Sequence, residues 1–222
     1  MHTGMGRIVE LLLEDGCRYA RISCSEGLIP RPGQYLLASH SSDSLLPVPI
    51  FHTDSAPQGF IGPAVEGWKP GDVLTLRGPL GRGFSLPVSA RKVGLVAFDS
   101  PPSRLRGLIP SALRQDASVV LLCNSSADHL PDEVEVQPVS ALQEIFQWAD
   151  FIALDAERAN LKQLLERLGN GTPRSVFSGA QVLVRTAMPC GGLADCGVCA
   201  LTTRSDWKMV CKEGPVFDLA EI

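Results

Sequence analysis

The sequence predicts a mixed β and α/β fold: an antiparallel β-barrel, then a small parallel α/β layer, then a short cysteine-rich C-terminal domain. Three observations lead to this prediction. Short apolar runs alternate with turn-forming residues in the first part of the chain, strand-like and helix-like runs alternate in the second, and four cysteines lie close together near the end. We expect the three domains to span residues 1–88, 89–180 and 181–222.

Composition limits the class of protein. With 222 residues, of which 45% are hydrophobic and 20% charged, the chain has the make-up of a globular protein of one or two domains. A formal charge of −4 gives no electrostatic reason to bind polyanions, so nucleic acid is not an expected partner. No apolar run approaches the roughly 18 residues of a membrane span, and the N-terminus does not resemble a secretory signal. We therefore expect a cytoplasmic protein without a membrane span.

Glycine and proline predict the barrel. They supply 21 and 17 residues, about 17% of the chain against roughly 12% in an average protein, and they are densest between residues 30 and 87. Between these turn formers lie five short β-type runs, at 7–13, 17–24, 34–38, 48–52 and 73–77. Strands at such regular spacing are typical of an antiparallel barrel or sandwich.

Strand-like and helix-like runs alternate after residue 88. The apolar runs cover 92–98, 118–123 and 150–155, and the helical patterns cover 104–114, 140–148 and 157–168. Such alternation favours a parallel sheet covered by helices.

The seven cysteines fall into two groups. Three of them, Cys17, Cys24 and Cys123, stand singly in apolar patterns, where a free cysteine behaves as a small hydrophobic residue. The other four form a C-x5-C-x2-C-x11-C run: Cys190, Cys196, Cys199 and Cys211. Four cysteines this close in a reducing compartment indicate a metal site more often than disulfides.

The linkers between these cysteines favour a [2Fe–2S] cluster. Structural zinc usually pairs two tight C-x2–4-C knuckles, whereas here only Cys196 and Cys199 form one. Three ligands in one loop followed by a distant fourth resemble the C-x4-C-x2-C…C spacing of plant-type ferredoxins. Gly191 and Gly192 would let the backbone pass close to inorganic sulfide and direct N–H groups at it. Zinc and disulfides remain as alternatives.

Two C-terminal segments resemble a known family. MPCGGLADCGVC at 188–199 and MVCKEGPVFDLAEI at 209–222 are similar to the iron–sulfur domain of the electron-transfer subunit of class 1B dihydroorotate dehydrogenase, within the ferredoxin–NADP reductase-like flavoproteins. RPGQYLL at 31–37 and KPGDVLTLRGPLGRGF at 69–84 resemble the same family. The resemblance implies a flavin-binding barrel, a nucleotide-domain-like α/β layer and a cluster domain.

The barrel departs from the family at the residues that contact FAD. The family's R-P-x-S/T motif reads Val48-Pro49-Ile50-Phe51, so both of its polar side chains are replaced by apolar ones. The family's G-x-G-T phosphate loop falls on 59–62, where Gly59 matches and Gly62 could present a backbone N–H. The resemblance thus places FAD at Pro49, Ile50, Phe51, Gly59 and Gly62. Because a pyrophosphate needs charge-assisted donors, we expect FAD to bind weakly or only within a complex.

The nicotinamide motif departs further. Where the family has a glycine-rich turn that opens a helix, this chain has Asp99-Ser100-Pro101-Pro102-Ser103. The turn supplies an acidic side chain and two residues that lack an N–H, so it is poorly suited to bind dinucleotide phosphates. We expect the isolated chain not to oxidise NAD(P)H.

These features together predict an electron-transfer subunit with a [2Fe–2S] cluster. The resemblance implies a hetero-oligomer with a catalytic, flavin-dependent dehydrogenase subunit such as dihydroorotate dehydrogenase, an enzyme of pyrimidine biosynthesis. Two alternatives stay open: a flavin-free iron–sulfur adaptor or assembly protein, and a structural subunit held together by a zinc site.

Overall fold

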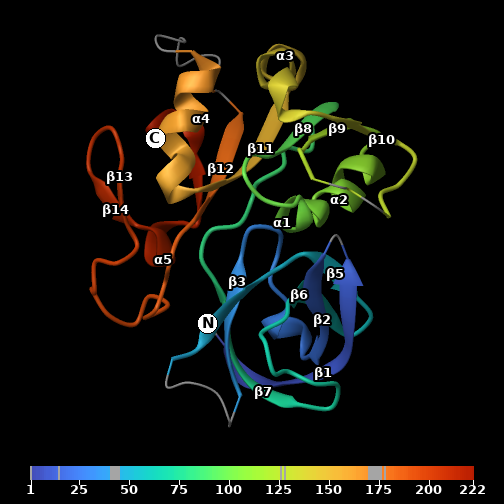
Figure 1. Cartoon of the computed structure of the whole chain (residues 1–222), viewed down its shortest axis with the longest axis vertical. Coiled ribbons are helices and arrows are strands. Elements are labelled where there is room, and N and C mark those ends of the chain that lie inside the picture. Colours follow the sequence, from blue (N-terminus) through green and yellow to red (C-terminus); the bar gives the residue numbers. More distant parts are fainter. Residues whose placement is uncertain are drawn as a thin grey trace.

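The first sheet is antiparallel and has seven strands in the order β4-β3-β7-β1-β2-β6-β5 (Figure 1). The computed structural model describes residues 2–14, 16–40, 46–125, 127, 129–169, 177 and 179–222. The strands of the first sheet are β1 (His2–Glu14), β2 (Cys17–Cys24), β3 (Tyr35–His40), β4 (Val48–Phe51), β5 (Asp54–Ala56), β6 (Gly59–Pro63) and β7 (Val73–Leu80).

The sheet curls into the predicted barrel. The two edge strands, β4 and β5, follow each other directly in the chain, and the backbone N–H of Thr53 between them donates to the carbonyl of Ile61 on β6 at 2.9 Å. Trp68 and Phe60 fill the interior together with aliphatic side chains of β1, β2, β3 and β7. Because side chains alternate between the two faces of a strand, one face of each strand points into this interior and the other points to solvent or to the rest of the molecule.

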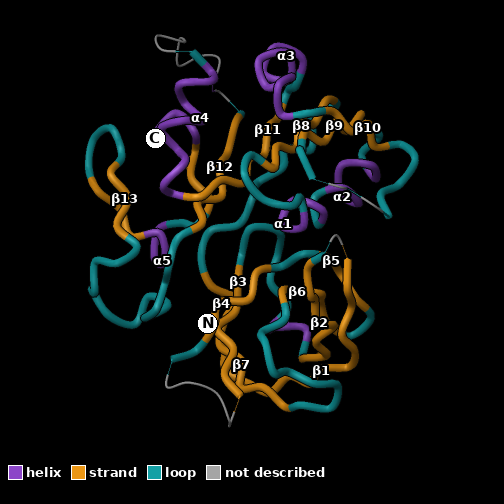
Figure 2. Tube along the Cα trace, viewed as in Figure 1, coloured by secondary structure: helices purple, strands orange, loops and turns teal. Residues whose placement is uncertain are grey.

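The second sheet has six strands in the order β10-β9-β8-β11-β12-β15 and is parallel except at β15. Figure 2 shows its strands β8 to β12 in orange, with helices in purple around them. Its strands are β8 (Lys92–Ala97), β9 (Ser118–Leu122), β10 (Val134–Gln137), β11 (Phe151–Glu157), β12 (Ala180–Arg185) and β15 (Val216–Asp218). The helices between them are α1 (Ser103–Arg106), α2 (Ile109–Arg114), α3 (Leu142–Trp148) and α4 (Leu161–Leu168).

The C-terminal segment leaves β12 and returns to the same sheet. It forms the hairpin β13 (Ala200–Thr202) and β14 (Trp207–Met209), then α5 (Val210–Glu213), and β15 pairs with β12. Arg82 at the end of the barrel forms an ion pair with Asp218 at 3.2 Å, so the G-P-L-G-R-G-F turn packs on this segment. The boundaries 1–88, 89–180 and 181–222 remain a prediction. Strand β12 extends past residue 180, and β15 of the C-terminal segment adds a strand to the α/β sheet.

The predicted fold class is confirmed. Helical turns form within each predicted helical run, and the eight predicted strand runs all contain strands. The short strands β5 and β6 and the strands β10 and β12 were not expected. Among the described residues, no helix is both long and apolar enough to cross a membrane.

Candidate metal centre

The four C-terminal cysteines meet in two pairs. Cys190 and Cys196 bring their sulfurs to 3.6 Å, and Cys199 and Cys211 bring theirs to 3.2 Å. A disulfide bond is about 2.05 Å long, so these thiols are not bonded to each other. Two thiolates on one tetrahedral metal, each about 2.3 Å from it, lie roughly 3.7 Å apart. Each pair is therefore spaced to share one metal atom.

The two pairs differ in their access to solvent. Cys196 is exposed and Cys190 is half-buried, whereas Cys199 and Cys211 are buried. The backbone N–H of Cys211 points to the sulfur of Cys199 at 3.5 Å, a contact that stabilises a thiolate. The centre therefore has one edge toward solvent and one edge inside the protein.

Glycines shape the loop between Cys190 and Cys196. Gly191 and Gly192 have φ angles of 49° and 82°, in the left-handed region that favours glycine. A Cβ atom on Gly191 would lie 2.2 Å from the Leu37 side chain of the barrel. The loop thus turns tightly against β3, which no residue with a side chain could do at this position.

The environment shifts the pKa values of two of these thiols in opposite directions. A backbone hydrogen bond at Ala194 lowers the pKa of Cys190 to about 7. Burial, together with the neighbouring Cys199, raises the pKa of Cys211 to about 12. Because metals bind thiolates, loading the centre must release the proton of the buried thiol.

The four thiols form one group, because Cys190 interacts with Cys211 as well as with Cys196. A binuclear cluster with four cysteine ligands takes two thiolates on each iron, and the two close pairs can supply them. The residues therefore fit a [2Fe–2S] cluster, with Cys190, Cys196, Cys199 and Cys211 as its proposed ligands.

The residues expected at FAD lie on two neighbouring strands. Pro49, Ile50 and Phe51 belong to β4, and Gly59 and Gly62 belong to β6. The structure brings Gly62 against Ile50, because a Cβ at Gly62 would lie 2.5 Å from the Cγ2 of Ile50. Gly59 lies at the far end of β6, where a Cβ would meet the backbone oxygen of Ile22 at 1.9 Å.

These five residues do not fit an FAD pyrophosphate. Both glycines lie within strand β6 and make room for close packing in the barrel, and Ile50 is part of the barrel core. The ring of Phe51 packs on Tyr35 at 5.5 Å and lies under the guanidinium of Arg104 at 5.7 Å. Arg104 is itself paired with a carboxylate, so it is not available as a phosphate ligand.

That carboxylate, Asp155, is the centre of an ion-pair network at the carboxyl ends of β8 and β11. Asp155 is fully buried and contacts Arg104 at 3.2 Å and Arg185 at 2.7 Å. Arg185 also pairs with Asp99 and with Glu157. Burial raises the pKa of Asp155, and Arg104 acts in the opposite direction.

The network occupies the topological switch point of the sheet. The chain runs from β8 outward to β9 and β10, then returns to β11 on the other side of β8. Open α/β sheets bind ligands in the crevice at this point. Arg104 and Arg185 pair there with Asp99, Asp155 and Glu157, so carboxylates outnumber guanidinium groups in the crevice. A cavity of about 340 Å³ opens beside them, and none of the described residues that line it is basic.

Sequence analysis missed Asp155 and Arg185. Both stand at the ends of apolar strands, Asp155 in DFIALD and Arg185 in AQVLVR. A charged residue that closes a buried parallel strand is a signal for the carboxyl edge of the sheet, and it could have indicated these two residues.

Comparison with known proteins agrees with this arrangement. Residues 186–222 match the family model of the iron–sulfur cluster binding domain of dihydroorotate dehydrogenase B. The gamma subunit of sulfhydrogenase 1 from Pyrococcus furiosus is 23% identical over 239 positions, covering 86% of this chain and 80% of that protein.

Solved structures show the same fold. An NADH-dependent reduced ferredoxin–NADP oxidoreductase, studied for flavin-based electron bifurcation, superposes with a TM-score of 0.74 at 20% identity over 99% of this chain and 90% of its own. Ferredoxin–NADP⁺ reductase from Plasmodium falciparum gives 0.61 at 11% identity over 82% and 95%. The chain thus joins a ferredoxin–NADP reductase-like fold to an iron–sulfur cluster-binding domain like that of dihydroorotate dehydrogenase B, the combination of an electron-transfer subunit.

Proposed function

We propose that this chain carries electrons through a [2Fe–2S] cluster held by Cys190, Cys196, Cys199 and Cys211, to or from a catalytic flavin-dependent dehydrogenase subunit. The observation that carries the proposal is the pairing of these cysteines at 3.6 and 3.2 Å inside the segment that matches the iron–sulfur family model. Such a cluster, when bound, accepts and gives up one electron at a time.

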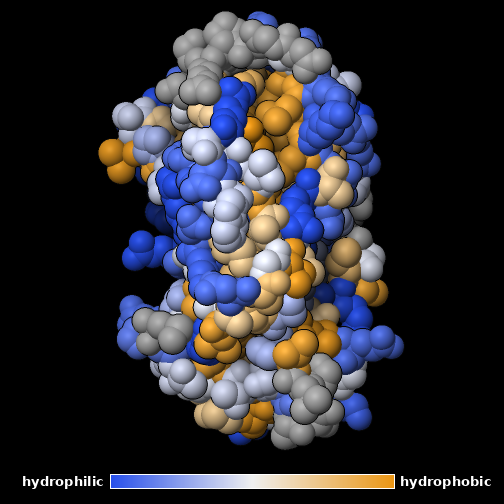
Figure 3. Space-filling view, turned by 90° about the vertical axis from the view of Figure 1, so that its left-hand side faces the viewer, coloured by the Kyte–Doolittle hydropathy of each residue, from blue (hydrophilic) through white to orange (hydrophobic). Residues whose placement is uncertain are grey.

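The surface around Cys196 supports contact with a protein partner. Leu193 and Val198 on the cysteine loop are 68% and 44% exposed, and Trp207 on the hairpin is 62% exposed. The face that carries the loop and hairpin mixes hydrophobic with hydrophilic surface (Figure 3). Exposed apolar side chains beside the solvent-facing ligand would let a partner exclude water and bring its own redox group close.

The nature of the partner is inferred from the relatives. The matched family model belongs to dihydroorotate dehydrogenase B, and the Pyrococcus relative is named as one subunit of a sulfhydrogenase. We therefore propose a hetero-oligomer in the cytoplasm, with a dehydrogenase such as dihydroorotate dehydrogenase as the catalytic subunit. The switch point, where carboxylates outnumber arginines, supports a chain that receives electrons from a protein and not from NADH.

Iron and sulfide analysis of the purified protein tests this function. We expect a red-brown protein with about two iron and two acid-labile sulfide per chain. Replacing a proposed ligand, in Cys196→Ser or Cys199→Ser, should remove the colour, because serine does not replace the thiolate. Cys17→Ser is the matched control, since Cys17 lies on the barrel strand β2.

Two results would contradict the proposal. Stoichiometric zinc without acid-labile sulfide would indicate a structural metal. An iron–sulfur cluster that no flavin-dependent dehydrogenase can reduce or oxidise would favour an adaptor or assembly protein. Flavin analysis of the same preparation tests the expectation that FAD is weakly held.

A further inference from the structure

One face of the barrel is turned toward the cysteine loops. Leu37 on β3 and Arg77 on β7 are cross-strand partners, so their side chains project from the same face, and Tyr35 lies two residues from Leu37. The alternate residues Leu36 and Ala38 point into the barrel core. Strand alternation therefore selects Tyr35, Leu37 and Arg77 as the barrel side chains directed at the C-terminal segment.

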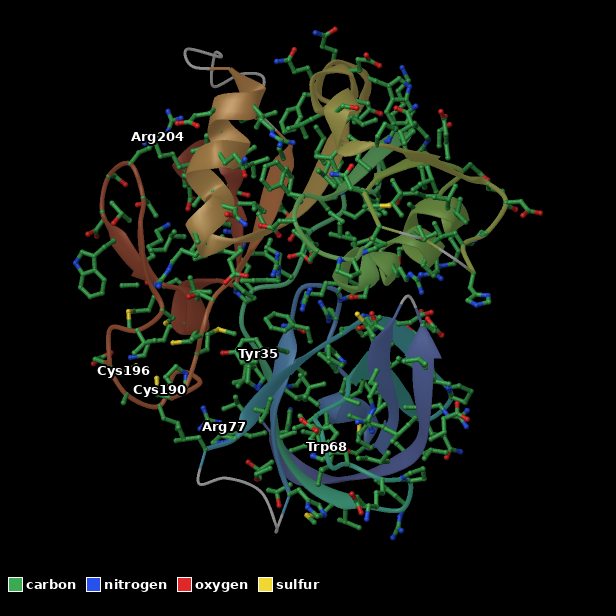
Figure 4. The ribbon with its side chains drawn as sticks, in the orientation of Figure 1. Tyr35, Trp68, Arg77, Cys190, Cys196 and Arg204 are labelled. Carbon is green, nitrogen blue, oxygen red and sulfur yellow. The ribbon has the colours of Figure 1, made fainter. Side chains whose placement is uncertain are left out.

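Each of these three side chains contacts the segment that holds the proposed ligands, and Figure 4 shows Tyr35 and Arg77 on the side of the barrel near Cys190. The hydroxyl of Tyr35 donates to the carbonyl of Cys211 at 3.1 Å. The Nη2 of Arg77 donates to the carbonyl of Gly191 at 3.1 Å, and Leu37 packs against the Cα of the same glycine. The barrel thus holds both parts of the centre: the loop that begins at Cys190 and the distant fourth cysteine.

Arg77 pairs with no carboxylate in the part of the chain that the structure describes. It is half-buried, and its Nε is buried without a hydrogen-bond partner. An unpaired, partly desolvated guanidinium is costly unless negative charge lies nearby. Four thiolates that bind an iron–sulfur core leave a net negative charge, and Arg77 hydrogen-bonds to the residue next to one of them.

We propose that Arg77 is the countercharge of the cluster, and that its guanidinium raises the reduction potential by stabilising the more negative, reduced state. This inference rests on the proposed function. The interaction is strong because Tyr35 and Leu37, both buried, keep water from this side of the centre. Arg77 is a positioning residue, since it acts through the loop and through its field without binding the metal.

Substitutions at Arg77 separate its charge from its hydrogen bond. Arg77→Gln keeps a donor and removes the charge, Arg77→Lys keeps the charge, and Tyr35→Phe removes a hydrogen bond without changing charge. Arg7→Gln is the matched control, because Arg7 on the same barrel also donates to a glycine carbonyl at 3.1 Å, that of Gly71. Iron and sulfide content is measured first, and the midpoint potential is then measured by a redox titration followed by electron paramagnetic resonance.

We expect Arg77→Gln to lower the midpoint potential, Arg77→Lys to restore most of it, and Tyr35→Phe and Arg7→Gln to shift it less than Arg77→Gln does. A chain that keeps its cluster with lysine and loses it with glutamine would also support the charge role. Equal potentials in wild type and Arg77→Gln would overturn the inference, as would equal shifts, or equal loss of the cluster, with glutamine and lysine. Failure of the proposed function is distinguishable. Wild-type protein would then contain no iron and sulfide, or it would hold a cluster that exchanges no electrons with a dehydrogenase while its potential still responds to the charge at residue 77.

Discussion

His52 is a buried titratable residue next to the junction of barrel and α/β layer. It follows β4, is 3% exposed and leaves its Nδ1 without a hydrogen-bond partner. A Cβ on Gly107 would lie 2.6 Å from the imidazole, so the ring is enclosed tightly between barrel and α1. Burial lowers the pKa of His52 from 6.5 to about 4, with Asp54 acting in the opposite direction.

This shift predicts that acid destabilises the protein through His52. The unfolded chain takes up a proton below pH 6.5 while the folded chain stays neutral down to about pH 4, so stability is present above pH 6.5 and falls across this window. We expect the free energy of unfolding to decrease by about 2 kcal/mol between pH 7 and pH 5 from this residue alone. Urea unfolding of wild type and His52→Gln at both pH values measures it.

Val88, which is 84% exposed and has no titratable side chain, supplies the control for this measurement. Val88→Ala should keep the full pH dependence of the wild type, whereas His52→Gln should lose about 2 kcal/mol of it. The same pH dependence in all three proteins would show that His52 is accessible to protons in the folded state.

At the scale of residues, the sequence predicts the cysteines of the centre, whereas only the structure identifies the barrel residues that contact their loops. The four cysteines could be predicted because their spacing is local, within 22 residues. Tyr35 and Arg77 could not, since their approach to Cys211 and Gly191 depends on barrel strands folding against a segment more than 100 residues away. Patterns along the chain do not contain such pairings.

At the scale of elements, the turn after β8 supports the prediction that NADH does not bind. Pro101 and Pro102 remove N–H donors before α1, which has only four residues. Asp99 accepts hydrogen bonds from the backbone N–H of Glu157 at 3.0 Å and from the side chain of Asn160 at 2.7 Å. A carboxylate of this chain therefore already uses two donors beside the turn.

NADH should therefore neither bind nor be oxidised. We expect no saturable binding in calorimetric titration with millimolar NADH, and no turnover with artificial electron acceptors, because the crevice offers negative charge to an anionic ligand. A ferredoxin–NADP reductase assayed in parallel serves as the positive control. Saturable binding at micromolar NADH would mean that the network around Asp155 opens to admit the cofactor.

The sequence could predict the elements that have a clear hydrophobic pattern. Strands β8, β9 and β11 are continuous apolar runs, as expected for a buried parallel sheet. Strands β5 and β6 are short, and β6 contains Gly59, Gly62 and Pro63, which weaken the strand pattern. The barrel still forms them, because pairing with β2 and the hydrogen bond from Thr53 outweigh local preference.

Over the whole molecule, one hydrophobic core joins the three parts. Tyr35, Leu37 and Phe51 of the barrel belong to the same buried cluster as Cys199 and Cys211 and as strands β11 and β12. The cysteine-rich segment is therefore not an independent appendage. Its last strand, β15, adds to the α/β sheet, and this return could not be predicted from a run of only three residues.

Phe217 on β15 should test this continuity. It is 1% exposed and pairs with Val182 of β12, and its ring lies against Gly214, where a Cβ would come within 2.4 Å of it. Because removing a buried aromatic ring leaves a cavity, Phe217→Ala should lower the free energy of unfolding by about 3–5 kcal/mol.

The same substitution should make the centre labile, because α5 and Cys211 precede β15 directly and share its core. Urea titration followed both by circular dichroism and by the visible absorbance of the cluster should give one transition in wild type, displaced to lower urea in Phe217→Ala. Val88→Ala, at an 84% exposed position, should stay within about 0.5 kcal/mol of wild type. If the cluster absorbance were lost at lower urea than the sheet signal in wild type, the cysteine segment would unfold by itself, and the shared core would not couple it to the rest.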